Sequence, residues 1–137
     1  MERHTAGVAP DERRVELVAK LHWAIQKLTV DLPEFKYNTA IAALMELTNL
    51  FEKLDQAELL LLEKEELLAV IKLLAPLAPF IAEELYDQAR VLGLAMQPSV
   101  HLETWPTYDV SLLFREEQNL VVQVNGKVRA QMLWPTT

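Results

Sequence analysis

The stretch that decides the fold is KYNTAIAALMELTNLFEKL, from Lys36 to Leu54. Its apolar residues recur every three or four positions, which is the spacing of one side of an α-helix. They form two adjoining rows, and two rows make a stripe wider than a surface helix needs, so we expect this helix to lie between other helices. The first row is Ala40, Leu44, Leu47, Phe51 and Leu54, and the second row is Ile41, Met45 and Thr48.

The flanking segments predict three more helices. One begins with Asp11 as its cap and ends near Val30, before a turn at 31–35 that contains a proline. Another covers residues 57–74, and the last covers 79–91 after two prolines that interrupt the chain. Asn38 or Thr39 is expected to cap the central helix. The residues expected to face inward are Val15, Val18, Leu21, His22, Ile25 and Leu28, then Leu67, Val70, Ile71 and Leu74, then Phe80 or Ile81, Leu85 and Ala89.

The pattern changes after Gly93, the expected end of the last helix. The next residues predict an ordered loop in which Val100, Leu102 and Trp105 pack on the helices. Asn125–Gly126 is the sequence of a type I′ turn and predicts a hairpin with strands at 119–124 and 127–133. The predicted fold is mainly α, an antiparallel helical bundle with a C-terminal β-hairpin. Its expected parts are a lead-in at 1–10, the bundle at 11–93, a connecting loop packed on it at 94–116, and the hairpin segment at 117–137.

The net charge of −7 argues at first against a nucleic-acid partner. The whole excess lies in residues 46–103, which hold 11 acidic and 4 basic side chains, whereas both ends are neutral. The ends could therefore bind RNA locally while the middle repels it. The chain has no cysteine, no apolar run of the roughly 18 residues that span a bilayer, and no apolar signal-peptide segment. We expect a cytoplasmic protein without membrane contact.

The chain shows no catalytic or metal-binding motif. Its three histidines lack the spacing of metal ligands, and it contains neither a nucleophile-elbow sequence nor a glycine-rich phosphate loop. His22 falls among inward-facing residues and is expected to be a hydrogen-bonded, half-buried side chain. A binding or scaffold module without a bound cofactor or metal is favoured over an enzyme.

Four segments, in order, resemble the C-terminal region of bacterial-type leucyl-tRNA synthetases: KYNTAIAALMELTN at 36–49, LLAPLAPFIAEELY at 73–86, VHLETWPTYD at 100–109 and VVQVNGKVRAQ at 121–131. The resemblance implies the anticodon-binding helical domain of a class I synthetase, followed by the start of a small C-terminal domain that is cut short here. It implies a leucine tRNA as partner, together with a catalytic domain that uses ATP and has no counterpart in this sequence. The chain would position tRNA without catalysing ligation by itself. The alternative is a helical interaction module that docks a separate catalytic subunit.

The candidate tRNA-binding residues are basic, because Lys and Arg bind phosphate groups. Those in the first helix that are seven residues apart share one face, which is either an RNA groove or a solvated surface of ion pairs. The two others are two residues apart and are therefore expected to share one face of a strand. The candidates are Arg13, Arg14, Lys20, Lys27 and Lys36, with Lys127 and Arg129 in the hairpin.

Overall fold

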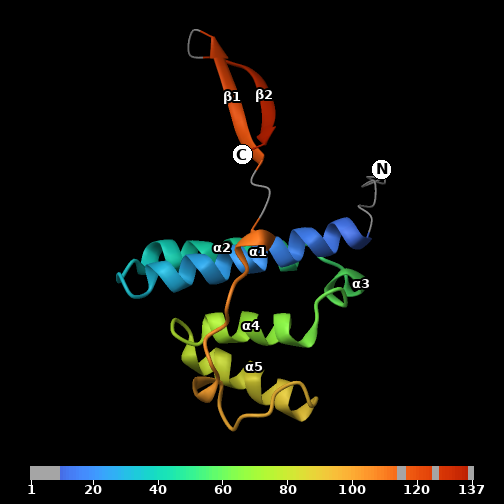
Figure 1. The fold of residues 1–137 in the computed structure, drawn as a ribbon, viewed down its shortest axis with the longest axis vertical. Helices are drawn as coiled ribbons and strands as arrows, with labels where there is room; N and C mark the ends of the chain where they lie inside the picture. The colour runs from blue at the N-terminus through green and yellow to red at the C-terminus, as the bar shows by residue number, and fades with distance from the viewer. Residues whose placement is uncertain (1–9, 114–116, 125–126, 136–137) are drawn as a thin grey trace.

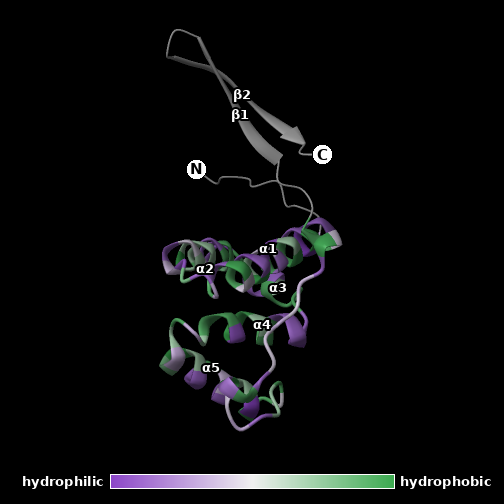
Figure 2. Ribbon diagram, turned by 60° about the vertical axis from the view of Figure 1, so that its left-hand side comes forward, coloured by the Kyte–Doolittle hydropathy of each residue, from purple (hydrophilic) through white to green (hydrophobic). Residues whose placement is uncertain are grey.

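The computed structural model describes residues 10–113, 117–124 and 127–135, and its longer helices lie in two layers (Figure 1). The first layer pairs α1 (Pro10–Asp31) with α2 (Tyr37–Glu52), and the second pairs α4 (Lys64–Leu74) with α5 (Pro79–Val91). The short α3 (Gln56–Leu59) connects the two layers. Each helix alternates between polar and apolar residues in Figure 2, as expected of helices that bury one side. The prediction of a mainly helical fold is confirmed.

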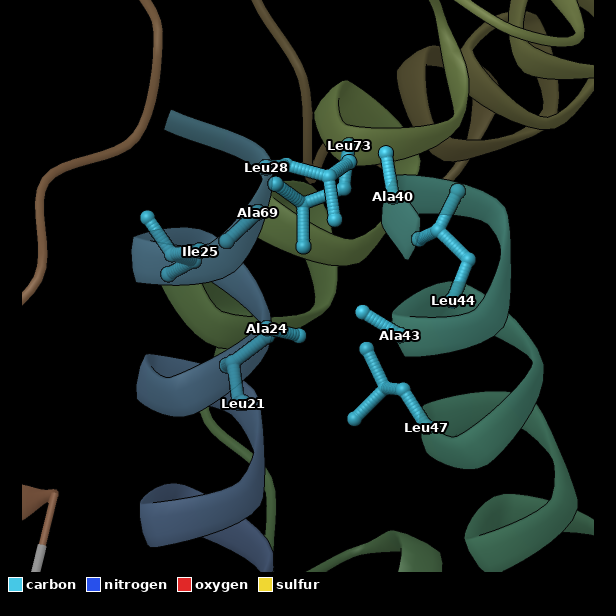
Figure 3. Close-up of a cluster of buried hydrophobic side chains, with 10 residues drawn as sticks. All are labelled: Leu21, Ala24, Ile25, Leu28, Ala40, Ala43, Leu44, Leu47, Ala69 and Leu73. Atoms are coloured by element: carbon cyan, nitrogen blue, oxygen red, sulfur yellow. The ribbon is translucent and has the colours of Figure 1, made fainter. Parts of the chain in front are cut away.

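The main core lies where α1, α2 and α4 meet (Figure 3). Leucine side chains from the three helices converge there, and alanines between them let the helix backbones approach closely. A second core joins α4 to α5 and to the loop after it, around Tyr86 and Val100. The main core consists of Leu21, Ala24, Ile25, Leu28, Ala40, Ala43, Leu44, Leu47, Ala69 and Leu73.

Only one of the two predicted rows of α2 is buried. Leu44 and Leu47 of the first row belong to the core, but Ile41 and Met45 of the second row are 45% and 58% exposed. The expectation that this helix is enclosed on both rows is therefore wrong for the described residues. The physical reason is that α2 packs its Ala40–Ala43–Leu47 side onto α1, and the second row points away from that contact.

The predicted inward faces of the other helices are partly wrong. In α1, Val15 is 65% exposed and the buried line runs through Leu17 and Leu21 instead. In α5, Ala89 is buried as expected, but Phe80, Ile81 and Leu85 are exposed, and the helix buries Ala82 and Tyr86. In α4 the fully buried residues are Leu68, Ala69 and Leu73, next to the half-buried Val70, Ile71 and Leu74, whereas Leu67 is exposed. The buried faces of these helices combine alanines with larger apolar residues.

The single helix predicted over 57–74 is two helices. Asp55 caps α3 by accepting the backbone N–H of Glu58, and the Glu58 carboxylate accepts the N–H of Asp55 in return. Glu66 accepts the N–H of Glu63 in the same way at the start of α4. Two acidic capping residues eight positions apart, Asp55 and Glu63, therefore separate the helices, with a run of leucines between them.

The ends of the other helices follow their sequence signals with two exceptions. α5 begins with Pro79 at its first position, and it ends in a Schellman motif in which Gly93 has φ 74° and Leu94 N–H donates to the carbonyl of Ala89. The cap of α2 is Lys36 without a side-chain hydrogen bond, so the expectation of Asn38 or Thr39 is wrong. Asp11 does not cap α1, which begins one residue earlier.

Beyond α5 the chain crosses back toward α1. The loop contains two 3₁₀ turns, η1 (Val100–Leu102) and η2 (Val110–Leu112). Of the predicted packing residues Val100 is buried, Leu102 is 63% exposed, and Trp105 is 36% exposed. The last described elements are the antiparallel strands β1 (Glu117–Val124) and β2 (Lys127–Pro135). The lead-in at 1–9 and the turn predicted at Asn125–Gly126 lie outside the described residues.

Candidate nucleic-acid interface

The two arginines at the start of α1 hold the N-terminal parts of α3 and α4. Arg14 donates from its two terminal nitrogens to the Glu66 carboxylate, at 3.0 and 2.8 Å, and also to the carbonyl of Leu61. Arg13 donates to Glu58 at 2.8 Å and to Glu16 at 2.7 Å. The hydrogen bonds to Glu66 raise the pKa of Arg14. These guanidinium groups therefore join segments far apart in the sequence, which gives them a structural role.

The three candidate lysines lie along the rest of α1 and the turn after it. Lys20 forms an ion pair with Glu46 of α2 at 2.6 Å and lies over the ring of Trp23, 3.8 Å from its centre. Lys27 pairs with Asp31 at 3.1 Å. The side chains of Lys20, Lys27 and Lys36 remain 30%, 40% and 57% exposed.

All five basic candidates in the helical part therefore have a carboxylate partner within the chain, since Lys36 pairs with Glu34. The face of α1 is a surface of ion pairs, as one of the two interpretations predicted. Exposed ion pairs such as those of Lys20 and Lys36 are worth little and exchange readily, so these two lysines can still turn toward a phosphate. Lys27 pairs with the buried Asp31 but leaves 40% of its own side chain exposed. Arg13 and Arg14 are less available because each guanidinium group binds more than one partner.

Whether the strand candidates Lys127 and Arg129 share one face depends on the register of β1 and β2. Val122 is opposite Ala130 and Gln123 is opposite Val128, so Arg129 has no opposite residue in β1. Such a bulge inserts one extra residue and interrupts the regular two-residue alternation. The argument that placed Lys127 and Arg129 on one strand face assumed regular alternation, and it does not hold across this bulge.

The turn between α1 and α2 is organised around the carboxylate of Asp31, whose burial the sequence pattern did not predict. Asp31 is 1% exposed and accepts hydrogen bonds from the hydroxyl of Thr39 and from the ammonium group of Lys27. Its backbone carbonyl accepts the N–H groups of Glu34 and Lys36 at 3.2 and 3.0 Å. The sequence does carry a signal for this turn. Asp31 falls in line with the buried leucines of α1 and precedes Thr39 by eight residues.

A strap of residues 103–113 ties the loop to the helices. Trp105 donates its ring N–H to Thr29 at 3.0 Å, and Nδ1 of His22 accepts the backbone N–H of Asp109 at 2.9 Å. The expectation of a half-buried, hydrogen-bonded His22 is confirmed. An open groove lies between α1 and η2, lined by charged residues of both signs and by Val15, Val18, Trp23, Leu112 and Leu113.

The loop nearer α5 is held by a second polar cluster. The hydroxyl of Tyr86 donates to Glu103 and accepts the N–H of Gln97, and Lys72 lies 3.5 Å from the same Glu103 carboxylate. Burial and the hydrogen bond to Glu103 raise the pKa of Tyr86. Glu83 accepts the hydroxyl of Ser99 and the N–H of Val100. Both clusters fix the path of the chain between α5 and the strands.

The stability of this protein is expected to fall in acid. The hydroxyl of Thr39 lowers the pKa of Asp31, that of Ser99 lowers the pKa of Glu83, and that of Ser111 lowers the pKa of Asp109. A carboxyl whose pKa is lower in the folded state stabilises the fold above its unfolded pKa, and this contribution is lost as pH falls through the folded value. Urea unfolding between about pH 6 and pH 3 should show a free energy of unfolding that is constant at first and declines below about pH 4. Glu83→Gln should make the decline shallower, and a profile flat down to pH 3 would contradict this account.

The described part of the chain contains no cluster of three His, Asp or Glu side chains arranged to hold a metal ion. None of the helices described above is long and apolar enough to cross a membrane.

A model of the family "Anticodon-binding domain of tRNA ligase" matches residues 15–136. The chain therefore belongs to this family. Its relatives are leucine–tRNA ligases. That of Dehalococcoides mccartyi is 39% identical over 98% of this chain and 16% of its own length, and that of Roseiflexus castenholzii is 37% identical over 94% of this chain and 14% of its own length.

A solved structure of a leucyl-tRNA synthetase also matches this chain. The leucyl-tRNA synthetase agnB2 of Agrobacterium radiobacter K84, in a ternary complex with tRNA and LeuAMS, matches 93% of this chain and 16% of its own chain, with a TM-score of 0.63 and 36% identity. The chain thus corresponds to the anticodon-binding region of leucine–tRNA ligases and spans about one sixth of their length.

Proposed function

We propose that this chain is the tRNA-binding module of a leucine–tRNA ligase in the cytoplasm, and that it positions a leucine tRNA for aminoacylation. The reaction and its ATP belong to a catalytic domain outside this sequence, and no cofactor is assigned to the residues present. The observation that carries the proposal is the family match over residues 15–136, supported by a relative solved together with tRNA. The strand pair would be the start of the following C-terminal domain, joined by a hairpin turn at 125–126.

The distribution of charge favours one end of the bundle over the other for the approach of RNA. Around the start of α1, α3 and the start of α4, residues 11–16 and 52–66 hold nine carboxylates and four basic side chains. The opposite end of α1, residues 27–36, holds two of each. A polyanion is repelled least at the second end. The proposed phosphate contacts are therefore Lys20, Lys27 and Lys36, together with Lys127 and Arg129 from the strands. Arg13 and Arg14 contribute mainly by stabilising the fold.

Titrating the 137-residue chain with a leucine tRNA at two salt concentrations tests this function. Binding should weaken steeply with salt, because each phosphate contact releases condensed counterions. The double variant Lys20→Gln/Lys36→Gln should bind more weakly and with a smaller salt slope. Glu46→Gln is the matched control of opposite sign, because it removes the partner of Lys20 and should strengthen binding. Salt-independent binding, or no binding, would contradict the proposal.

A second candidate function is supported by the exposed row of Ile41 and Met45 on α2. Such a row suits a helical partner, and it would serve a module that docks a separate catalytic subunit. Docking of that kind would tolerate salt, and Met45→Glu would abolish it while leaving tRNA binding in place. The same titration therefore separates the two functions.

A further inference from the structure

The turn between α1 and α2 presents two aromatic rings to solvent. Phe35 is 76% exposed and Tyr37 is 47% exposed, and their rings meet edge to face with centres 6.1 Å apart at 73°. We infer that Phe35, supported by Tyr37, is a stacking point for an unpaired base of the bound RNA. This inference rests on the proposed function and adds the contact that reads an unstacked nucleotide.

The backbone of the turn gives the first argument. Phe35 has φ 58°, and it is the one non-glycine residue with positive φ in the part of the chain that the structure describes. This conformation is unfavourable for a bulky side chain, and Gly or Asn would adopt it more easily. An aromatic ring kept in such a position, yet almost without contacts to the core, suggests a contact made outside the chain.

The rigidity of the turn gives the second argument. The buried Asp31 fixes it from inside through Thr39, Lys27 and the backbone N–H groups of Glu34 and Lys36. A ring held on a fixed turn loses little conformational freedom when a base stacks on it. The ring of Tyr37 contacts the Phe35 ring in this edge-to-face pair, and Phe35 remains 76% exposed, which leaves ring surface for a base.

Charge decides which partner fits. The ammonium group of Lys36 lies in the same turn, and although it pairs with Glu34 its side chain is 57% exposed, so a nucleotide stacked on Phe35 can place its phosphate near a cation. The second strongly exposed phenylalanine, Phe80, is 89% exposed, but within four residues of it the chain holds the carboxylates of Glu83 and Glu84 and no basic side chain. Base stacking beside cations is the usual way in which proteins hold single-stranded nucleotides. Of the two rings, Phe35 is therefore the one suited to RNA.

Substitutions of Phe35 in the full 137-residue chain test the inference with a leucine tRNA as the probe. Phe35→Gly should raise the melting temperature, because glycine accepts positive φ, and should weaken tRNA binding by about fivefold to a hundredfold, the range for loss of one stacked base. The slope of affinity against salt should not change, because no charge is removed. Phe35→Trp should restore the affinity, and Phe80→Ala should leave it unchanged.

Each other outcome overturns the inference in an identifiable way. If the unmodified chain binds tRNA and Phe35→Gly binds equally well, the stacking contact is wrong and the proposed function stands. If Phe35→Leu binds tRNA as tightly as the unmodified chain, any apolar side chain suffices and the ring does not stack on a base. If the unmodified chain does not bind tRNA at all, both the stacking contact and the proposed function fail.

Discussion

Replacing Leu47 with alanine is expected to lower the free energy of unfolding by about 2–5 kcal/mol. Leu47 is 0% exposed and lies in the core between α1 and α2, where it faces Leu21 and Ala24 (Figure 3). The truncation removes buried methyl groups and leaves a cavity that two packed helices cannot close. Urea unfolding followed by circular dichroism at 222 nm measures the effect directly.

Met45→Ala is the matched control, because it shortens an apolar side chain two positions earlier on the same helix. Met45 is 58% exposed, and alanine has a helix propensity at least as high, so the change should stay within about 0.5 kcal/mol. Equal destabilisation by the two variants would show that both rows of α2 are buried, as the sequence pattern alone predicted, and would contradict the packing described here.

Replacing Tyr86 with alanine is expected to cost about 3–5 kcal/mol, the range for removing a buried aromatic ring. Tyr86 is 1% exposed and forms the centre of the second core, between α4, α5 and the loop that contains Val100. Its loss should also release the loop, because the hydroxyl that joins Gln97 and Glu103 disappears. Amide hydrogen exchange should accelerate around residues 97–103 before it does so in α1 and α2.

Tyr86→Phe separates packing from hydrogen bonding. It keeps the ring but leaves the N–H of Gln97 without its acceptor, so we expect a loss of about 1–2 kcal/mol, confined to the same loop. If Phe were as harmful as Ala, the polar cluster rather than the ring would carry the stability of this core. If Phe were neutral, water would replace the hydroxyl.

Much of the fold could be predicted because its signals are local. Pro79 and Gly93 fixed the ends of α5 through backbone restrictions that act within a few residues. The turn after Asp31 and the length of α2 followed from proline and from apolar spacing in the same way. The split between α3 and α4 was also local, but its acidic capping pairs were overlooked in favour of the leucine run between them.

The buried faces were harder to predict, because periodicity gives an apolar side of a helix but not its rotation about the axis. In α5, Ile81 and Leu85 are as apolar as Ala82 and Tyr86, and only contact with α4 decides which pair is buried. Alanines matter more than their size suggests, since close helix contacts need small residues. Val15 of α1 is likewise exposed, although it belongs to an apolar line of that helix.

In the candidate site, the ion pairs were likewise harder to predict than the positions of the charged residues. Sequence spacing placed Arg13, Lys20 and Lys27 on one side of a helix, but Arg13 and Lys20 have partners on other helices, Glu58 of α3 and Glu46 of α2. For these two residues, carboxylates tens of residues away decide whether the side chain stabilises the fold or remains available to bind a phosphate. The four-residue spacing of Lys27 and Asp31 indicates their ion pair, but nothing local shows that Asp31 is buried or that the hydroxyl of Thr39 donates to it.

By itself the sequence determined the helical class, most of the helix ends and, through four ordered segments, membership in the anticodon-binding family of tRNA ligases. The tertiary structure alone decided which rows are buried, which cations are already paired, and that Phe35 stands exposed on a rigid turn. Helix ends depend on backbone restrictions within one turn of the chain. Burial, ion pairing and exposure depend on which distant segments come into contact, and that information exists only in the folded chain.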